Sequence, residues 1–481
     1  MFLFNLCVFM ITFYFIYLLV LLIIILYILY IFNLALLTQY LWRYQYYFIS
    51  IILLILYIYI NINIHLYSIL NLYTYNLIFF NYWFIDYNFI LFYFPFIFIF
   101  IVITLITLIF CFTYNFYELH MFILYVITIW IAGIGLFYSN SLIYFFLFYE
   151  LLLIPSFLIL YNYAKTRKCI EAAFLMFFWT QFGALWLIFG FIYLFTITQT
   201  YFFFNYFLIQ FSPFQLNFLF FIFIISFGVK FPIWPFYDWL PKAHVEASTN
   251  FSIFLSGVLV KFAFFGFLKC ILSFQLEPTF YYIFPLIFIG IIDSVSKVYY
   301  QLDLKKLIAY ATVLEMHWLL LIIFNGQSSL WLTAFYMLIS HALISSNFFL
   351  LVDSLTRRFK TRLITEISGL MWLVPWLYFF ILISIITFLG FPGSIFFLAE
   401  IYFFLFFFDI NIFWTLLLLV IIYCYFGICF FKNWFLILFN YSYFFMTYNL
   451  IKDLDLKEIC LFNFFIFLLY WLGLMNQFLF I

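Results

Sequence analysis

Charged residues are scarce in this 481-residue chain. Aspartate, glutamate, lysine and arginine together make up 7% of it, and the formal net charge is +1. Soluble globular proteins carry about 25% charged residues, so this composition excludes a water-soluble fold. A nucleic-acid surface is excluded as well, because phosphate neutralisation needs clustered lysine and arginine.

Cysteine clusters and nucleotide-binding motifs are also missing. The seven cysteines form no CxxC pair and have no histidine partners, so we expect no zinc, haem or iron-sulfur site. The sequence contains neither a GxGxxG following a strand nor a GxxxxGK[ST] motif. We therefore expect no cofactor in this chain, including NADH, flavin and ATP.

Apolar residues dominate what is present. They make up 71% of the chain, which includes 85 phenylalanines and 42 tyrosines. A membrane-spanning helix needs about 20 apolar residues, and hydropathy predicts an all-α polytopic membrane protein of about 14 transmembrane helices. The predicted spans lie near residues 8–32, 48–73, 88–112, 119–139, 141–161, 170–196, 213–240, 249–272, 281–300, 305–324, 329–352, 370–407, 410–431 and 459–480.

Two of these spans contain helix breakers. Pro232 and Pro235 interrupt the seventh, and Gly390, Pro392 and Gly393 interrupt the twelfth. Freed backbone groups at membrane depth are tolerated only where protein or water satisfies them, as in the discontinuous helices of transporters. Because the two breaks lie five spans apart, they suggest two related halves.

The distribution of positive charge predicts the orientation. Lys230 and Lys261 lie within spans. Of the other 16 lysines and arginines, 15 fall in loops after odd-numbered spans or at the adjoining span ends, and the exception is Lys269. Loops rich in lysine and arginine face the negative compartment. We therefore expect both termini to face the opposite side.

Six ionisable residues are predicted to lie at membrane depth, where a charge costs about 2.5 to 3.5 kcal/mol. Such groups on neighbouring helices can form a proton relay. We expect Glu150 to pair with Lys230, and a central group to link them to a terminal glutamate. The alternative is a set of buried ion pairs that only hold helices together. The six are Glu150, Lys230, Lys261, Glu315, His341 and Glu400.

The remaining charges have simpler interpretations. His317 is two residues from Glu315, so the two side chains should point to different helix faces, and His317 is interpreted as a satisfied core histidine. Asp293 is expected to face water near a helix end, and Asp353 to pair with the arginines that follow it. A solvated loop is expected for Asp238, Lys242, His244 and Glu246.

One stretch is specific enough to indicate a family. Residues 228–247 read GVKFPIWPFYDWLPKAHVEA, and GVLVK follows at 257–261. FYELLLIP at 148–155, QLDLKKLIAY at 301–310, SHAL at 340–343 and GFPG at 390–393 are further matches. Over roughly residues 140–460 the chain resembles the chain 4 family of NADH:ubiquinone oxidoreductase, respiratory complex I.

The resemblance implies an antiporter-like subunit of the membrane arm, with two inverted five-helix repeats. It would pump protons while other subunits oxidise NADH and reduce ubiquinone, and those subunits would hold the flavin and the iron-sulfur clusters. Its partners would be other membrane-arm subunits, including neighbouring antiporter-like chains, and membrane lipid. The expected regions are 1–117 (N-terminal helices), 118–272 (first repeat), 273–432 (second repeat) and 433–481 (C-terminal loop and last helix). By motif position, the family roles would fall to Glu150, Lys230, Lys261, His341 and Glu400.

One position departs from the family. Residues 309–316 read AYATVLEM, where the family usually reads AYSSVSHM, so Glu315 stands where a relay histidine is expected. A glutamate can carry protons, provided that burial raises its pKa toward neutrality.

Codon bias and the motifs together indicate a location. Phenylalanine, tyrosine, isoleucine and asparagine have A/T-rich codons, which suggests an organellar genome. We therefore expect the mitochondrial inner membrane, with odd-numbered loops toward the matrix and both termini toward the intermembrane space. A cation/proton antiporter subunit of the related multi-subunit type is the alternative function, and a scaffold with purely structural charges is the third.

Overall fold

The computed structural model describes residues 95–107, 116–163, 166–206, 209, 211–274, 284–324, 328–410, 412–439 and 452–474. All of them belong to one compact unit, residues 78–480. The spans expected near residues 8–32 and 48–73 lie outside the described residues.

The described part of the chain is helical, and the only β-type pairings within it are two isolated bridges, Ser141 with Phe202 and Asp303 with Leu363. The predicted all-α class is therefore confirmed for these residues. Its α-helices are α4 (Phe116–Tyr138), α5 (Leu142–Leu151), α6 (Leu153–Asn162), α7 (Arg167–Thr198), α8 (Phe203–Tyr206), α9 (Pro213–Lys230), α10 (Trp239–Glu246), α11 (Thr249–Phe254), α12 (Val260–Ser273), α13 (Phe284–Tyr300), α14 (Leu304–Phe324), α15 (Ser328–Phe359), α16 (Leu370–Leu373), α17 (Pro375–Phe388), α18 (Ile395–Ile410), α19 (Ile412–Leu419), α20 (Gly427–Phe439) and α21 (Leu456–Leu474). A 3₁₀ turn, η2 (Phe236–Asp238), and two π-helical segments, η3 (Leu255–Leu259) and η5 (Val420–Phe426), complete the set.

Nine helical stretches within the described ranges are long and apolar enough to cross a membrane. Shorter apolar helices cover Pro95–Thr107, Pro375–Phe388 and Ile395–Leu405. The chain is therefore a polytopic membrane protein, and the total of 14 spans stays a prediction.

Burial separates central from peripheral helices. The spans Thr249–Ser273, Leu304–Ile323 and Thr333–Phe359 are 94%, 89% and 100% buried, whereas Met121–Tyr138 is 39% buried. Peripheral helices carry large exposed side chains such as Phe178 and Leu185 on α7, which suits contact with lipid tails. The three central spans bear Lys261, Glu315 and His341, so the fold places these groups away from lipid.

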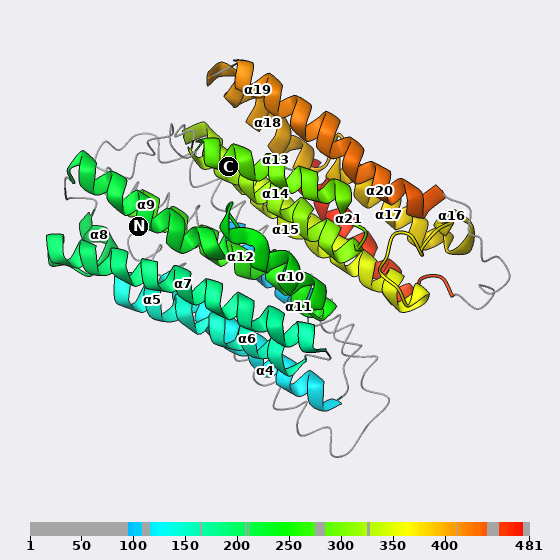
Figure 1. Cartoon of the computed structure of the whole chain (residues 1–481), viewed down its shortest axis with the longest axis horizontal. Helices are drawn as coiled ribbons and strands as arrows, with labels where there is room; N and C mark the ends of the chain where they lie inside the picture. The colour runs from blue at the N-terminus through cyan, green and yellow to red at the C-terminus, as the bar shows by residue number, and fades with distance from the viewer. Residues whose placement is uncertain are drawn as a thin grey trace, which may run out of the picture. The chain divides into compact units, whose positions relative to one another are not determined.

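The central helices connect two groups of neighbours. In Figure 1, α4 to α9 (cyan to green) lie on one side of α12, and α13 to α21 (green to red) lie on the other. Helix α12 packs against α9, while α11 and η3, which precede it in the same span, pack against α15. Figure 1 also shows α7 beside α9 and α13 beside α14.

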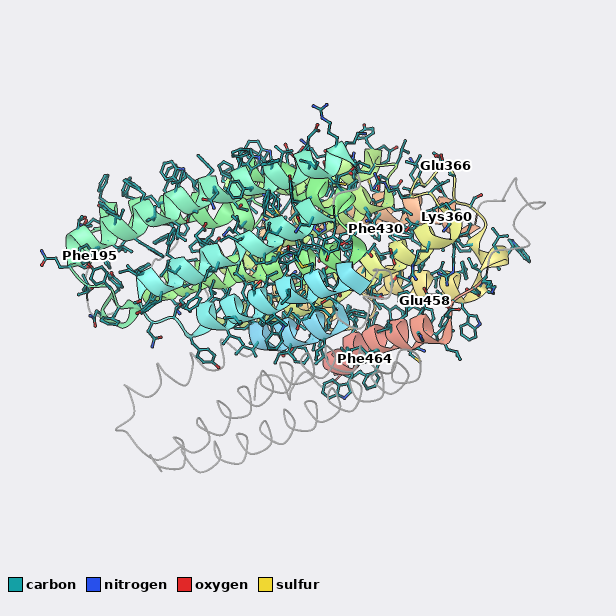
Figure 2. The ribbon with its side chains drawn as sticks, turned by 90° about the horizontal axis from the view of Figure 1, so that it is seen from below. Phe195, Lys360, Glu366, Phe430, Glu458 and Phe464 are labelled. Carbon is teal, nitrogen blue, oxygen red and sulfur yellow. The ribbon has the colours of Figure 1, made fainter. Side chains whose placement is uncertain are left out.

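Charged side chains gather at one end of the helices. Figure 2 shows Lys360, Glu366 and Glu458 at this end and Phe195 at the other. Arg357 pairs with Asp353 at 2.9 Å, as the sequence predicts, and also with Glu458 at 2.9 Å. Arg358 donates two hydrogen bonds to the same Glu458 carboxylate and so ties α15 to α21.

Both predicted helix breaks are present. Helix α9 ends at Lys230, and the chain passes Pro232 and Pro235 before η2 begins. Helix α17 ends at Phe388, and Gly390 and Gly393 adopt φ angles of 76° and 92° before α18 starts. Left-handed backbone of this kind is readily accessible to glycine alone, which explains the glycines at the second break.

Candidate functional site

Glu150 on α5 and Lys230 at the end of α9 contact each other beside the first break. The Lys230 ammonium lies 3.4 Å from Glu150 Oε1, and the two side chains are 13% and 20% exposed. Lys230 also donates to the Tyr149 carbonyl at 3.3 Å and lies 3.5 Å from the centroid of the Tyr149 ring. Gln181 on α7 donates to the second carboxylate oxygen of Glu150 at 3.1 Å. The predicted pair is therefore present, and Gln181 fixes its carboxylate.

Lys230 also lines a cavity of ≈ 40 Å³ that extends to α12. Tyr149, Ser156 and Thr180 contribute polar groups to its wall, and Val260 and Phe262, the two neighbours of Lys261, lie on its far side. A water molecule needs roughly 10 to 15 Å³ of such space. The cavity thus has room for water between the two lysine-bearing helices.

Lys261, His341 and Glu315 meet at the centre of the described helices. The Lys261 ammonium lies 2.6 Å from His341 Nδ1 and also donates to the Ser256 carbonyl. On the opposite side of the imidazole, His341 Nε2 lies 3.6 Å from Glu315 Oε2, an ion-pair separation longer than a hydrogen bond. All three residues are at most 4% exposed. The structure therefore brings together the predicted central group.

The contacts on the two sides of the His341 ring indicate which nitrogen carries its proton. While Lys261 is charged its ammonium can only donate, so Nδ1 accepts from it and the proton of a neutral imidazole is assigned to Nε2. That proton then points toward the carboxylate of Glu315. Lysine, imidazole and carboxylate thus form a directed series in which each donor faces an acceptor.

The backbone beside Lys261 is irregular. The π-helical segment η3 directly precedes α12, and the Ser256 carbonyl that accepts from Lys261 belongs to it. Single π turns free carbonyl groups from the regular helical ladder and are frequent at functional sites. Here the π-helical segment supplies the Ser256 carbonyl as one of the hydrogen-bond acceptors of the Lys261 ammonium.

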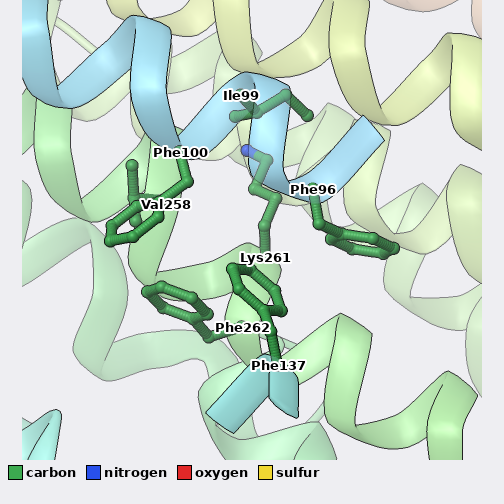
Figure 3. A pocket seen from close by; sticks show the side chains of 7 residues that line it. All are labelled: Phe96, Ile99, Phe100, Phe137, Val258, Lys261 and Phe262. Carbon is green, nitrogen blue, oxygen red and sulfur yellow. The ribbon is translucent and has the colours of Figure 1, made fainter. Parts of the chain in front are cut away.

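The stem of Lys261 passes through an apolar collar (Figure 3). Phe96, Ile99 and Phe100 from the helix Pro95–Thr107, together with Phe137, Val258 and Phe262, line a cavity of ≈ 10 Å³ around it. Such a volume holds about one water at most. The collar surrounds the lysine with carbon on this side, so the polar contacts of its ammonium are the Ser256 carbonyl of η3 and His341 of α15.

Glu400 lies at the second break. It is 3% exposed, and the Tyr423 hydroxyl of η5 donates to its Oε2 at 2.5 Å. A Cβ atom on Gly390 would collide with the same carboxylate oxygen. The break therefore gives Glu400 the space it occupies, and the second π-helical segment supplies its hydrogen-bond donor.

His317 is separate from the central group. Its Nε2 accepts a hydrogen bond from the Trp234 amide at 2.9 Å, and its Nδ1 donates to the Val313 carbonyl at 2.8 Å. The interpretation as a satisfied core histidine on a different face from Glu315 is confirmed. The structure adds that His317 holds the backbone of the first break.

One expectation about charged residues was wrong. The solvated-loop interpretation fails for His244, which is fully buried in α10 and stacks on Phe349. The burial of Lys269, counted as a charge at the even-numbered end of its span, was not expected: it is 2% exposed, donates to the Ser139 carbonyl at 2.5 Å and lies 5.0 Å from the Phe203 ring centroid. The signal for Lys269 was its place two helical turns after Lys261, and for His244 the apolar residues beside it.

Metal ligation is the next possibility for these side chains. Within the described ranges, no group of three or more histidine, cysteine, aspartate or glutamate side chains is arranged to hold a metal ion. The ionisable groups of the site instead contact one another in pairs and short series. Pairs and series of this kind can hold and pass protons.

Comparison with known proteins identifies the family. Residues 139–427 match the family model described as NADH:quinone oxidoreductase/Mrp antiporter, TM. The chain is 36% identical over 312 residues to NADH-ubiquinone oxidoreductase chain 4 of Paramecium tetraurelia, which covers 63% of this chain and 64% of the relative. It is 33% identical over 279 residues to NADH-quinone oxidoreductase subunit M of Rickettsia felis, covering 56% of this chain and 55% of the relative. The chain thus spans less than two thirds of the length of these curated relatives.

Solved structures with the same fold belong to multi-subunit complexes. One is a chain of respiratory complex I from Thermus thermophilus with bound NADH, with a TM-score of 0.68, 21% identity, and coverage of 79% of this chain and 81% of that chain. Another is a chain of the Mrp complex from Dietzia sp., with a TM-score of 0.67, 15% identity, and coverage of 79% and 82%. The resemblance seen in the motifs is confirmed, and the chain belongs to the NADH:quinone oxidoreductase/Mrp antiporter transmembrane family.

Proposed function

We propose that this chain is a proton-translocating membrane subunit of respiratory complex I, coupled to NADH oxidation and ubiquinone reduction in partner subunits. The observation that carries the proposal is the contact of Lys261, His341 and Glu315 in the three most buried spans. Buried ionic groups are weak evidence for stability, because desolvation can exceed the Coulomb attraction. A series of proton donors and acceptors at membrane depth is instead what proton transport requires.

The proposed route begins at the first break. Glu150 holds the Lys230 ammonium, and a movement that separates them leaves that charge without its partner and favours release of a proton. Water in the cavity between Lys230 and α12 would carry the proton toward Lys261. His341 and Glu315 pass it onward, and Glu400 is the last group before release.

Glu315 takes the role that a histidine has in the family motif. Both of its oxygens are buried and accept no hydrogen bond from any residue that the structure describes. The nearest ionisable group is His341, through Nε2. A carboxylate so placed can receive a proton from the imidazole without first breaking another bond.

The finer architecture is part of the same proposal. The chain would have 14 spans with inverted repeats at 118–272 and 273–432, preceded by 1–117 and followed by 433–481. It would lie in the mitochondrial inner membrane, with odd-numbered loops toward the matrix. Its partners would be other membrane-arm subunits, including antiporter-like neighbours, and lipid. It would hold no redox centre, since NADH, flavin, iron-sulfur clusters and ubiquinone would bind partner subunits.

The likeness to a chain of the Mrp complex supports one alternative, a cation/proton antiporter subunit. Such a subunit would use the same lysine and glutamate helices. The two functions differ in their partners, because the antiporter needs no NADH-oxidising module.

Native-gel separation of mildly solubilised membranes, with an in-gel stain for NADH oxidation and mass spectrometry for this chain, tests the assignment. Co-migration with the large NADH-oxidising band is the expected result. Presence only in a smaller particle without NADH oxidation would refute complex I and support the antiporter. For the assembled complex, Lys261→Ala should retain quinone reduction and lose proton translocation, and a purely structural role would instead lower assembly and leave translocation per complex unchanged.

A further inference from the structure

A second ionisable cluster lies at the first break, apart from the central group. Lys297 on α13 donates to the Tyr237 hydroxyl at 2.5 Å, and that hydroxyl donates to Asp293 Oδ2. Lys297 also pairs with Asp293 at 3.0 Å and with Asp238 at 3.4 Å. The Tyr237 hydroxyl thus stands between an ammonium donor and a carboxylate acceptor.

The members of this cluster differ widely in exposure. The side chain of Asp238 is 61% exposed, Lys297 is 33% and Asp293 is 29% exposed, while Tyr237 is 1% exposed. Lys297 belongs to the last turn of α13, toward the end of the helix that leads to the basic residues Lys305 and Lys306. The cluster therefore runs from the water-facing surface at the lysine-rich end of the helices to a buried hydroxyl.

His317 forms the inner boundary of the cluster. Its ring is perpendicular to that of Tyr237 with centroids 6.1 Å apart, and it accepts the Trp234 amide at 2.9 Å. Gly290 of α13 leaves room for this ring, because a Cβ atom there would overlap it. His317 is fully buried, and its hydrogen bond with the Trp234 amide connects the cluster to the backbone just after Lys230.

We propose that Asp238, Lys297, Tyr237 and Asp293 form a proton-uptake site that opens on the side faced by the odd-numbered loops. The inference rests on the proposed function, since it names where protons enter the chain. Neither the helix break nor the central group requires a charged residue at 293 or 297. A purely structural link between α13 and η2 would be served by one ion pair, whereas here a tyrosine hydroxyl bonds to both members of the Lys297–Asp293 pair and offers a second route for the proton.

The transfer step is balanced. Lys297 gives one proton to the Tyr237 oxygen while the original hydroxyl proton moves to Asp293 Oδ2, leaving a neutral amine, a neutral carboxylic acid and an unchanged tyrosine. The amine then takes a proton from water at the surface, where Asp238 attracts cations. The groups that face this site from α14 are Tyr310, with its ring centroid 5.8 Å from the Lys297 ammonium, and His317.

The test uses the assembled complex in inside-out inner-membrane vesicles, whose matrix side faces the medium. The variants are Tyr237→Phe, which removes only the bridging hydroxyl, and Asp293→Asn. Tyr300→Phe is the matched control, because Tyr300 lies on α13 with Asp293 and its side chain is 76% exposed. Proton uptake from the medium per quinone reduced is followed from pH 6 to pH 9 with a pH indicator.

Proton transfer by a positioned side chain typically contributes about 10²- to 10⁴-fold. Because Lys297 and Asp293 also contact each other directly, we expect the smaller loss of about tenfold or more for uptake by Tyr237→Phe. The loss should grow with pH, because protons in the medium become scarcer, and Tyr300→Phe should behave as the unmodified chain. Asp238→Asn should have a smaller effect that fades with added salt, as expected for a screened surface charge.

Three results separate the possibilities. Normal uptake by Tyr237→Phe at every pH, while Lys261→Ala abolishes it, overturns the uptake site alone. Normal uptake by Lys261→Ala overturns the proposed function instead. If Tyr237→Phe lowers assembly, Lys297→Met is measured in its place. A pH-dependent loss of proton uptake per assembled complex supports the site. Uptake by Lys297→Met at the rate of the unmodified complex at every pH overturns it.

Discussion

Replacing Glu315 by glutamine tests the central group directly. The substitution keeps the volume of the side chain and removes one negative charge from a site that is 1% exposed. No hydrogen bond from a described residue is lost, because neither oxygen accepts one. The change therefore acts on the electrostatic interaction with His341 and leaves the packing of α14 unchanged.

The magnitude follows from the separation. Once Lys261 has passed a proton to His341 Nδ1, the imidazolium faces the Glu315 carboxylate with Nε2 and Oε2 3.6 Å apart, and their attraction is about 4 to 5 kcal/mol at an effective dielectric constant of about 20. Each step of about 1.4 kcal/mol is a factor of ten, so the proton-carrying form of His341 becomes roughly a thousandfold rarer. We expect proton translocation by Glu315→Gln to be nearly abolished, with assembly retained.

The assay is proton translocation per NADH oxidised in vesicles that contain the assembled complex. Glu315→Asp, which keeps a carboxylate, should recover part of the activity, and Glu366→Gln, an exposed glutamate on the loop labelled in Figure 2, should have no effect. Full translocation by Glu315→Gln would refute the reasoning, because it would show that no charge at this position is needed.

Three further substitutions have outcomes that the contacts predict. Arg358→Met should destabilise the chain by about 3 kcal/mol, because it leaves the buried carboxylate of Glu458 with one partner fewer, and thermal denaturation of the solubilised complex measures this. Gly390→Ala should lower the stability of the chain by about 1 to 2 kcal/mol, because Gly390 has a left-handed φ, and the new Cβ should displace Glu400. Proton translocation, measured in vesicles, should therefore fall more than assembly, measured on blue-native gels. Lys269→Met should cost about 1 to 3 kcal/mol, because a buried carbonyl loses its donor, while translocation per assembled complex stays unchanged.

Sequence reasoning located the ionisable groups well. Apolar context marks a charge at membrane depth whatever the helix arrangement, so Glu150, Lys230 and Glu400 could be identified from their neighbours alone. Their spacing along separate helices also made the contact of Glu150 with Lys230 a natural hypothesis, and the structure confirms it. The proton-carrying role of all six groups stays a prediction.

The features that the sequence did not indicate have a common physical origin. Hydropathy places a residue by its distance along the chain, whereas burial depends on which segments fold over it. Lys269 lies near the end of its span, yet the turn that contains Ser139 and the short helix α8 cover it, so its ammonium is capped by a backbone carbonyl and three phenylalanine rings. Gln181, the partner of Glu150, and Tyr423, the partner of Glu400, carry no charge, so a pattern of charges at membrane depth does not indicate them.

Glu315 and His317 show how one helix, α14, can contribute side chains to two separate sites. Glu315 and His317 are two positions apart, so their side chains diverge by about 200° around the helix axis. Glu315 faces His341 in the central group, whereas His317 faces the backbone at the first break and the ring of Tyr237. A histidine at 317 therefore cannot replace the one that the family motif has at 315, and its position couples the second cluster to the segment that carries Lys230. Since both ends of this coupling lie at the break in the seventh span, a movement there would change the surroundings of Lys230 and of the second cluster together.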